Sequence, residues 1–201
     1  MMDKLADKTE LILASASPRR RELLALTGLP FTVDAPQVDE RCALPAREAV
    51  AEISLRKAQA GALRHQGAVI LAADTLVAVD GVPLGKPRDR DDALRMLRLL
   101  SGRWHEVFTG VCAVDASGEV HSGVDATSVR FSPMTDEEIC AYLSTGEPMD
   151  KAGAYAIQGV AGLWIEEIRG SASNVIGLPL ALTRRLLRDC GLSLPGGLSE
   201  H

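Results

Sequence analysis

Aromatic side chains and positive charge are both in short supply in this sequence. Phe, Tyr and Trp make up 3% of its 201 residues, and the formal net charge at pH 7 is −5. A surface that binds nucleic acid needs basic side chains for the phosphates and aromatic rings on which the bases stack. The composition therefore predicts no nucleic-acid partner.

Long apolar runs and cysteine clusters are also missing. No run approaches the roughly 20 apolar residues of a membrane-spanning helix, and the N-terminal segment MMDKLADKTE has no secretion-signal core. We therefore expect a cytoplasmic protein without a membrane partner. The four cysteines form no Cys-x-x-Cys or Cys/His cluster, which favours reduced thiols over a disulfide or a zinc site.

Common nucleotide-binding and nucleophile motifs are absent. The sequence has no G-x-x-x-x-G-K-[ST] loop, no G-x-G-x-x-G after a predicted strand and no G-x-S-x-G elbow. A P-loop kinase and a Rossmann dehydrogenase are therefore not supported.

What the sequence does contain is an alternation of short apolar runs and helical patterns. The turn signal Asp80-Gly81 predicts a hairpin, so the sheet should be mixed and the fold class α/β or α+β. We expect one domain over 11–191, between a flexible extension (1–10) and a loose tail (192–201). Strands are predicted at 11–14, 31–33, 68–79, 107–114, 119–131 and 163–168. Helices are predicted at 18–27, 47–65, from a cap near Asp89 or Asp91 to before Gly102, 136–144 and 180–190.

The stretch 11–26, LILASASPRRRELLAL, breaks a local rule of helix formation. Ser17 is a suitable N-cap and Pro18 a suitable first helical residue. Three arginines, 19–21, then fill the first turn, where the helix dipole already places positive charge. Free amides and guanidinium groups at one point suit a phosphate. A solvated basic patch is the alternative, and this stretch alone does not decide between them.

Asp74 lies inside the most apolar stretch of the chain, AVILAADTLVAV. A carboxylate in such surroundings must be paired or must take part in chemistry. It could be a metal ligand or a general base, or it could cap a neighbouring loop. Asp39 and Glu40 could supply a second carboxylate for Mg²⁺, although ordinary loop charge is the simpler interpretation of that pair. Cations for phosphates and carboxylates for a metal favour hydrolysis of a nucleoside triphosphate.

These segments, in this order, resemble the Maf family of nucleoside triphosphate pyrophosphatases. The resemblance covers nearly all of 11–188. It is carried by LASASPRRRELL (13–24), VDE (38–40), LAADTLV (71–77), LGKP (84–87), ALRMLRLLSGRWHEVFTGV (93–111), EPMDKAGAYAIQG (147–159) and GSASNVIGLPL (170–180).

The resemblance implies a two-lobed α/β fold, similar to inosine triphosphate pyrophosphatases, with an elongated mixed sheet, flanking helices and a central cleft. It implies hydrolysis of a nucleoside triphosphate to the monophosphate and pyrophosphate, with a divalent cation, Mg²⁺ or Mn²⁺. By the same resemblance, Asp74 is the catalytic proton acceptor and Glu40 the second carboxylate. The specificity positions fall on Arg19, Thr75 and Gln158, and the cleft lysines on Lys57 and Lys86.

The run DKAGAYAIQG, with Lys151, Tyr155 and Gln158, looks like the branch of the family that acts on dTTP and UTP. An amide offers a donor and an acceptor, which suits the O4/N3–H edge of a pyrimidine. The branch that acts on 7-methyl-GTP typically carries Glu at this place. A 7-methyl-GTP or other modified-nucleotide pyrophosphatase, or a non-enzymatic regulator of septum formation, are the alternatives.

These residues together make one mechanistic hypothesis. A small-molecule nucleotide is the expected partner, and a homodimer is compatible with the sequence. Arg21 is expected to be ordinary surface charge. We expect Ser15, Ser17, Arg19 and Arg20 to hold the triphosphate, Glu40 and Asp74 to bind the metal, and Lys57, Lys86 and Lys151 to offset the developing charge.

Overall fold

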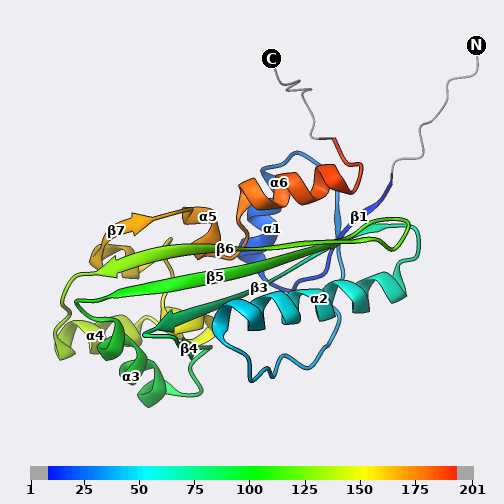
Figure 1. The fold of residues 1–201 in the computed structure, drawn as a ribbon. Coiled ribbons are helices and arrows are strands. Elements are labelled where there is room, and N and C mark those ends of the chain that lie inside the picture. Colours follow the sequence, from blue (N-terminus) through cyan, green and yellow to red (C-terminus); the bar gives the residue numbers. More distant parts are fainter. Residues whose placement is uncertain (1–8, 194–201) are drawn as a thin grey trace, which may run out of the picture.

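A seven-stranded mixed sheet runs through the molecule (Figure 1). The computed structural model describes residues 9–193, so 1–8 and 194–201, which hold most of the expected extension and tail, lie outside the described residues. The strands are β1 (Leu11–Leu13), β2 (Thr32–Val33), β3 (Val69–Val79), β4 (Val82–Leu84), β5 (Trp104–Val114), β6 (Val120–Phe131) and β7 (Ile165–Arg169).

The strand order is β2-β1-β3-β5-β6-β7, with β4 paired to one end of β3. β1 is parallel to β2 and β3, and the other pairs are antiparallel. Asp80-Gly81 forms the two-residue turn of the β3–β4 hairpin, with Val79 opposite Val82. The expected mixed α/β sheet is confirmed.

Six α-helices and three short 3₁₀ segments cover the sheet within residues 9–193. Side-chain caps start several of them: Asp89 accepts from the amide of Asp92 at 2.8 Å, and Thr135 and Glu138 form a complete capping box. None of the helices described is both long and apolar enough to cross a membrane. They are α1 (Pro18–Ala25), α2 (Ala46–Arg64), α3 (Arg90–Leu100), α4 (Asp136–Ser144), η1 (Glu147–Asp150), η2 (Ala152–Ala154), η3 (Val160–Trp164), α5 (Ala172–Ile176) and α6 (Leu180–Asp189).

The segment 147–176 differs most from the sequence prediction. The strand expected at 163–168 begins only at Ile165, because 160–164 form a 3₁₀ segment, and the short helix α5 was not predicted. Isolated residues such as Tyr155 and Ala161 reach the core from single turns here. Neither a period of two nor one of 3.6 residues exists in such a segment, so periodicity could not locate its elements.

The core is divided between the two ends of the long strands. At one end, α1 and α6 cover one face of the sheet and α2 covers the other (Figure 1). At the other end, α3, α4 and the 3₁₀ segments pack around the β3–β4 hairpin and the paired ends of β5 and β6. This division gives the two lobes of the expected fold.

Between the lobes, one edge of β3 is open. β1 pairs with β3 only over Leu11–Leu13 opposite Val69–Leu71, and β4 pairs with it only from Val77 onward. Within residues 9–193, no strand pairs with the stretch between them on that side. The chain leaves β1 at this gap and enters the loop before α1, as expected for a ligand site beyond the carboxyl end of a parallel strand.

Candidate active site

A cavity of about 590 Å³ opens at this gap in the sheet edge. Its walls come from the loop and start of α1, from α2, from the middle of β3, and from the loops around η1 and η2. Of the residues that the sequence singled out for the site, Asp39 does not line the cavity. The others do: Ser15, Ser17, Arg19, Arg20, Glu40, Lys57, Asp74, Thr75, Lys86, Lys151 and Gln158.

Asp74 and Lys57 form a buried ion pair on the cavity wall. The Nζ of Lys57 lies 2.7 Å from Oδ1 of Asp74, and the two side chains are only 10% and 11% exposed. The same Nζ lies 2.9 Å from Oε1 of Glu40, whose side chain is 58% exposed. Two carboxylates therefore converge on one cationic point, with Asp74 inside and Glu40 at the solvent side.

The position of Lys57 follows from the packing of α2. Its buried residues recur three and four positions apart, and Lys57 falls on this stripe with Val50, Ile53 and Ala58. Close packing of the helix on β5 is possible because Gly110 has no side chain: a Cβ there would lie 2.2 Å from the carbonyl oxygen of Val50. A lysine on the buried face of this helix is thereby held against β3.

The loop before α1 forms the opposite wall. Ser15 is buried, and its Oγ accepts from the amide of Ser17 at 3.3 Å. The side chain of Ser17 caps the helix by accepting from the amide of Arg20 at 3.5 Å. No acidic residue occupies the first turn of α1, so its free amides and positive dipole end are not neutralised locally.

The three arginines of α1 have different surroundings. Arg21 is exposed, as expected. Arg19 forms an ion pair of 3.5 Å with Asp150 across the cavity. Arg20 turns inward and donates to the carbonyl of Gly177 at 2.8 Å, to Oγ of Ser15 at 3.3 Å and to Oγ1 of Thr75 at 3.1 Å. Arg20 therefore already donates hydrogen bonds to three protein groups.

Burial lowers the pKa of the Arg20 guanidinium, an effect that the charge of Asp74 opposes. Its three protein contacts come from the loop after β1, from β3 and from the segment after α5. Arg20 thus holds together three parts of the chain that line the cavity. A direct bond from Arg20 to a substrate stays a prediction.

Two further lysines and the predicted specificity glutamine also line the cavity. Lys151 bonds the carbonyl of Glu147 at 2.9 Å and pairs with Asp150. Lys86 and Gln158 are exposed and make no ion pair or side-chain hydrogen bond with any residue in 9–193. Both are therefore available to a ligand.

An aromatic cluster lies behind the cavity wall formed by Tyr155. The hydroxyl of Tyr155 is 2.8 Å from Nε2 of His105, and both rings meet Phe131 edge to face. Burial lowers the pKa of His105 to about 4, so its ring is neutral at neutral pH. The cluster fixes the start of the loop that ends in Gln158.

Two groups in the site were missed by the sequence reasoning. Asp150 lines the cavity as the partner of Arg19 and Lys151, and Thr109 lies fully buried behind Thr75. Asp150 could have been found, because it is the only carboxylate next to the lysine in the run DKAGAYAIQG. Thr109 leaves no signal, since a threonine is common in any strand.

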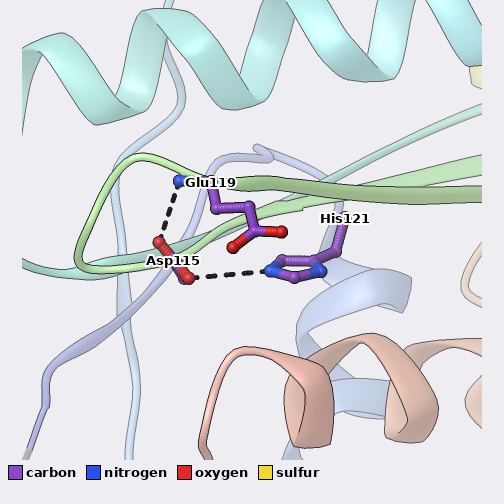
Figure 2. Close-up of side chains that lie close together, drawn as sticks. All are labelled: Asp115, Glu119 and His121. Carbon is purple, nitrogen blue, oxygen red and sulfur yellow. Dashed lines mark hydrogen bonds and ion pairs between the residues drawn. The ribbon is translucent and has the colours of Figure 1, made fainter.

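One further group of metal-ligand types lies away from the cavity, at the β5–β6 turn (Figure 2). Here Asp115, Glu119 and His121 approach one another. The carboxylate of Asp115 accepts from the hydroxyl and amide of Ser117 and from the amide of Glu119, at 2.7 to 2.9 Å. These bonds lower the pKa of Asp115 to about 2. They close the β5–β6 hairpin, so the carboxylate of Asp115 has a structural role in the turn.

This chain is similar to known proteins over most of its length. A family profile described as "Maf-like protein" matches residues 10–190. A protein of Anaeromyxobacter dehalogenans named "dTTP/UTP pyrophosphatase" is 53% identical over 92% of this chain and 96% of its own length. Proteins of the same name from Symbiobacterium thermophilum and Thermococcus gammatolerans are 51% and 48% identical, over 90% and 92% of this chain and 94% and 98% of theirs.

Among solved structures, the Staphylococcus aureus Ham1 protein aligns with a TM-score of 0.46 at 15% identity. The alignment covers 61% of this chain and 72% of that chain.

Proposed function

The chain belongs to the Maf family, and from that premise we propose that it hydrolyses dTTP and UTP to the monophosphate and pyrophosphate. The observation that carries the proposal is the cavity: cations from four separate segments meet there around a buried carboxylate. This arrangement suits a polyphosphate whose hydrolysis depends on positioning and charge neutralisation.

In the proposed reaction, water attacks the α-phosphorus of the nucleotide. The bond from the α-phosphorus to the bridging oxygen of the β-phosphate breaks, and pyrophosphate leaves with that oxygen. Asp74 accepts the proton of the attacking water as general base. Lys57, Lys86, Lys151 and Arg19 offset the charge that develops on the phosphates.

The donor set fits a divalent cation. Glu40 and Asp74 each place a carboxylate oxygen beside the Nζ of Lys57, 2.9 and 2.7 Å away, so the two oxygens lie near each other and a divalent cation would compete with the Lys57 ammonium for them. Carboxylate oxygens are the ligands that Mg²⁺ and Mn²⁺ prefer. We propose that Glu40 and Asp74 hold the ion, which would neutralise phosphate charge when bound.

The base is proposed to meet Gln158, which lines the cavity together with Thr75. A glutamine amide can pair with the O4 acceptor and the N3–H donor of thymine or uracil, and it tolerates the 5-methyl group that distinguishes them. A carboxylate at this position would suit the donor-rich edge of a guanine instead. The 7-methyl-GTP alternative is therefore disfavoured by this residue.

A nucleotide panel tests the proposal. Pyrophosphate release is measured with Mg²⁺ or Mn²⁺ for dTTP, UTP, CTP, GTP and 7-methyl-GTP. We expect the highest kcat/KM for dTTP and UTP. A higher value for a purine nucleotide would overturn the substrate assignment, and no release from any of them would favour a non-enzymatic role in septum formation.

Asp74→Asn tests the general base. The amide keeps the size of the side chain but does not accept a proton at neutral pH, so kcat should fall by about 10³ or more with the fold intact. Circular dichroism and the thermal midpoint provide the folding control. Turnover at the wild-type rate would contradict the assignment.

A cytoplasmic location and a homodimer stay predictions from the sequence.

A further inference from the structure

The hydroxyl of Thr75 lies in a chain of hydrogen bonds that leads away from the cavity. Its Oγ1 accepts from Arg20 at 3.1 Å and lies 2.9 Å from Oγ1 of Thr109. Oγ1 of Thr109 lies 3.0 Å from the backbone carbonyl of Asn174 in α5. Thr109 and Asn174 are completely buried, so water does not complete their hydrogen bonds.

The carbonyl of Asn174 sets the direction of this chain, because a carbonyl only accepts. A hydroxyl has one proton, and Thr109 uses it to donate to Asn174. The Asn174 carbonyl also accepts from the amide of Gly177 at 3.0 Å, but the reverse direction would still leave its oxygen and Oγ1 of Thr109 3.0 Å apart with no proton between them, which is repulsive. Thr75 must therefore donate its own proton to Thr109.

The acceptor at the end of the chain is itself held in place. The side-chain amide nitrogen of Asn174 donates to the carbonyl of Val107 at 2.9 Å and to Oγ1 of Thr127 at 3.0 Å. Thr127 in turn donates to the carbonyl of Ser171 at 3.2 Å. These bonds fasten α5 to β5 and β6, so the Asn174 carbonyl remains opposite Thr109.

The proton of Thr75 is thus used inside the protein, and one of its two lone pairs is used by Arg20. We infer that Thr75 presents only a hydrogen-bond acceptor to the nucleotide, and that Thr109 and Asn174 are positioning residues that set this polarity. The inference rests on the proposed function. Its match in dTTP and UTP is the N3–H of the base, so that Gln158 is left to donate its amide N–H to O4. Cytosine carries a lone pair at N3 instead.

Gln158 cannot supply this discrimination alone. Its amide can turn over and exchange its donor and its acceptor, and no side-chain hydrogen bond to residues 9–193 prevents this. An amide that turns over can pair with uracil in one orientation and with cytosine in the other. An acceptor of fixed polarity, such as Thr75, favours the base with N3–H.

The test compares Thr109→Val with Thr109→Ser, using kcat/KM for UTP divided by kcat/KM for CTP. Valine has the same shape but leaves the Thr75 proton free to donate, so the ratio should fall about tenfold. Serine keeps the hydroxyl and should keep the ratio. A loss of stability alone would lower both rates together and leave the ratio unchanged, which would overturn the inference.

Thr75→Val keeps the inference testable if Thr109→Val does not fold. Removing the acceptor should also lower the UTP:CTP ratio about tenfold, and an unchanged ratio would overturn the inference.

The sugar 3′-hydroxyl is a second donor that Thr75 could bind, so 3′-deoxy-UTP is compared in wild type and Thr75→Val. We expect an equal effect in both. A loss confined to wild type would overturn the assignment to N3–H.

These outcomes are distinguishable from failure of the proposed function. Wild-type protein that releases no pyrophosphate from dTTP or UTP contradicts the proposed function before any variant is compared. Wild-type activity on UTP with an unchanged ratio in folded Thr109→Val contradicts only the inference on polarity.

Discussion

Two neighbouring carboxylates show how single residues divide structural and chemical roles. Asp39 lies next to Glu40 in the loop before α2, but it forms a bidentate pair with Arg41 outside the cavity. That hydrogen bonding lowers the pKa of Asp39 to about 2. Glu40 instead turns to Lys57 and lines the cavity. The loop therefore contributes one carboxylate to the site.

Glu40→Gln and Asp39→Asn form a matched pair of variants. We expect Glu40→Gln to raise the Mg²⁺ concentration for half-maximal pyrophosphate release and to lower kcat at least tenfold, because one of two converging carboxylates is lost. Asp39→Asn should stay within about twofold of wild type, because an exposed ion pair contributes little. Titration of Mg²⁺ against initial rate measures both effects. Equal behaviour of the two variants would contradict the metal assignment.

The chemical types in the site could be predicted from the sequence, whereas their partners could not. Asp74 was recognisable because a carboxylate in an apolar strand is costly unless it is used. Lys57 lies in a stretch rich in alanine, and its spacing from Val50 and Ile53 places it on the buried face of α2. The bond between Arg20 and Gly177 joins positions 157 apart, and no local pattern encodes such a contact.

At the scale of elements, the contact between α2 and β5 determines where the Lys57–Asp74 pair lies. Gly110 allows the backbone of α2 to approach β5, since an added Cβ would overlap the carbonyl group of Val50. Val50 and Lys57 are seven positions apart and share one face of the helix. A shift of α2 away from β5 would therefore move Lys57 away from Asp74.

Gly110→Ala should destabilise the protein by about 2–3 kcal/mol and lower kcat, because the clash is with backbone that can only move with the whole helix. Gly123→Ala is the control. Its Cβ would meet the tip of the Leu182 side chain at 2.9 Å, which can rotate away, so about 1 kcal/mol or less is expected. Urea unfolding and pyrophosphate release measure both variants. A Gly110→Ala variant as stable and active as Gly123→Ala would contradict this account.

Most elements up to α4 could be predicted because each has a strong local signal. The Asp80-Gly81 turn, the Asp89 cap and the Thr135–Glu138 capping box all lie where the sequence indicates. The segment 147–164 has no such signal, and its three 3₁₀ segments are set by contacts with the rest of the core. One example is the hydrogen bond that the amide of Gly153 donates to the carbonyl of Gly85 at 3.0 Å.

At the scale of the whole molecule, the site lies between two core regions that the long strands connect. The region around the β3–β4 hairpin contains the aromatic cluster, and Tyr155 belongs both to this core and to the cavity wall. Protonation of His105 would place a charge inside that core. The stability of the fold should therefore depend on pH through this residue.

The direction in which stability changes with pH follows from the pKa values of His105 in the folded and the unfolded protein. Burial lowers the pKa of His105 to about 4 in the folded protein, against 6.5 as its ordinary value. Below pH 6.5 the unfolded chain binds a proton that the folded chain does not, so stability is lost as the pH falls from about 6.5 to about 4. Between pH 7.5 and pH 5 the loss from this residue should be about 2 kcal/mol, at about 1.4 kcal/mol per pH unit.

His105→Gln isolates this contribution, since glutamine does not titrate and still offers the Tyr155 hydroxyl a hydrogen-bond partner. Urea unfolding at pH 7.5 and pH 5 should show a loss about 2 kcal/mol smaller in the variant than in wild type. Carboxylates such as Asp92 and Asp115, whose pKa values are lowered to about 2, act at lower pH and are common to both proteins. Parallel pH profiles for the two proteins would show that His105 does not titrate on unfolding as proposed.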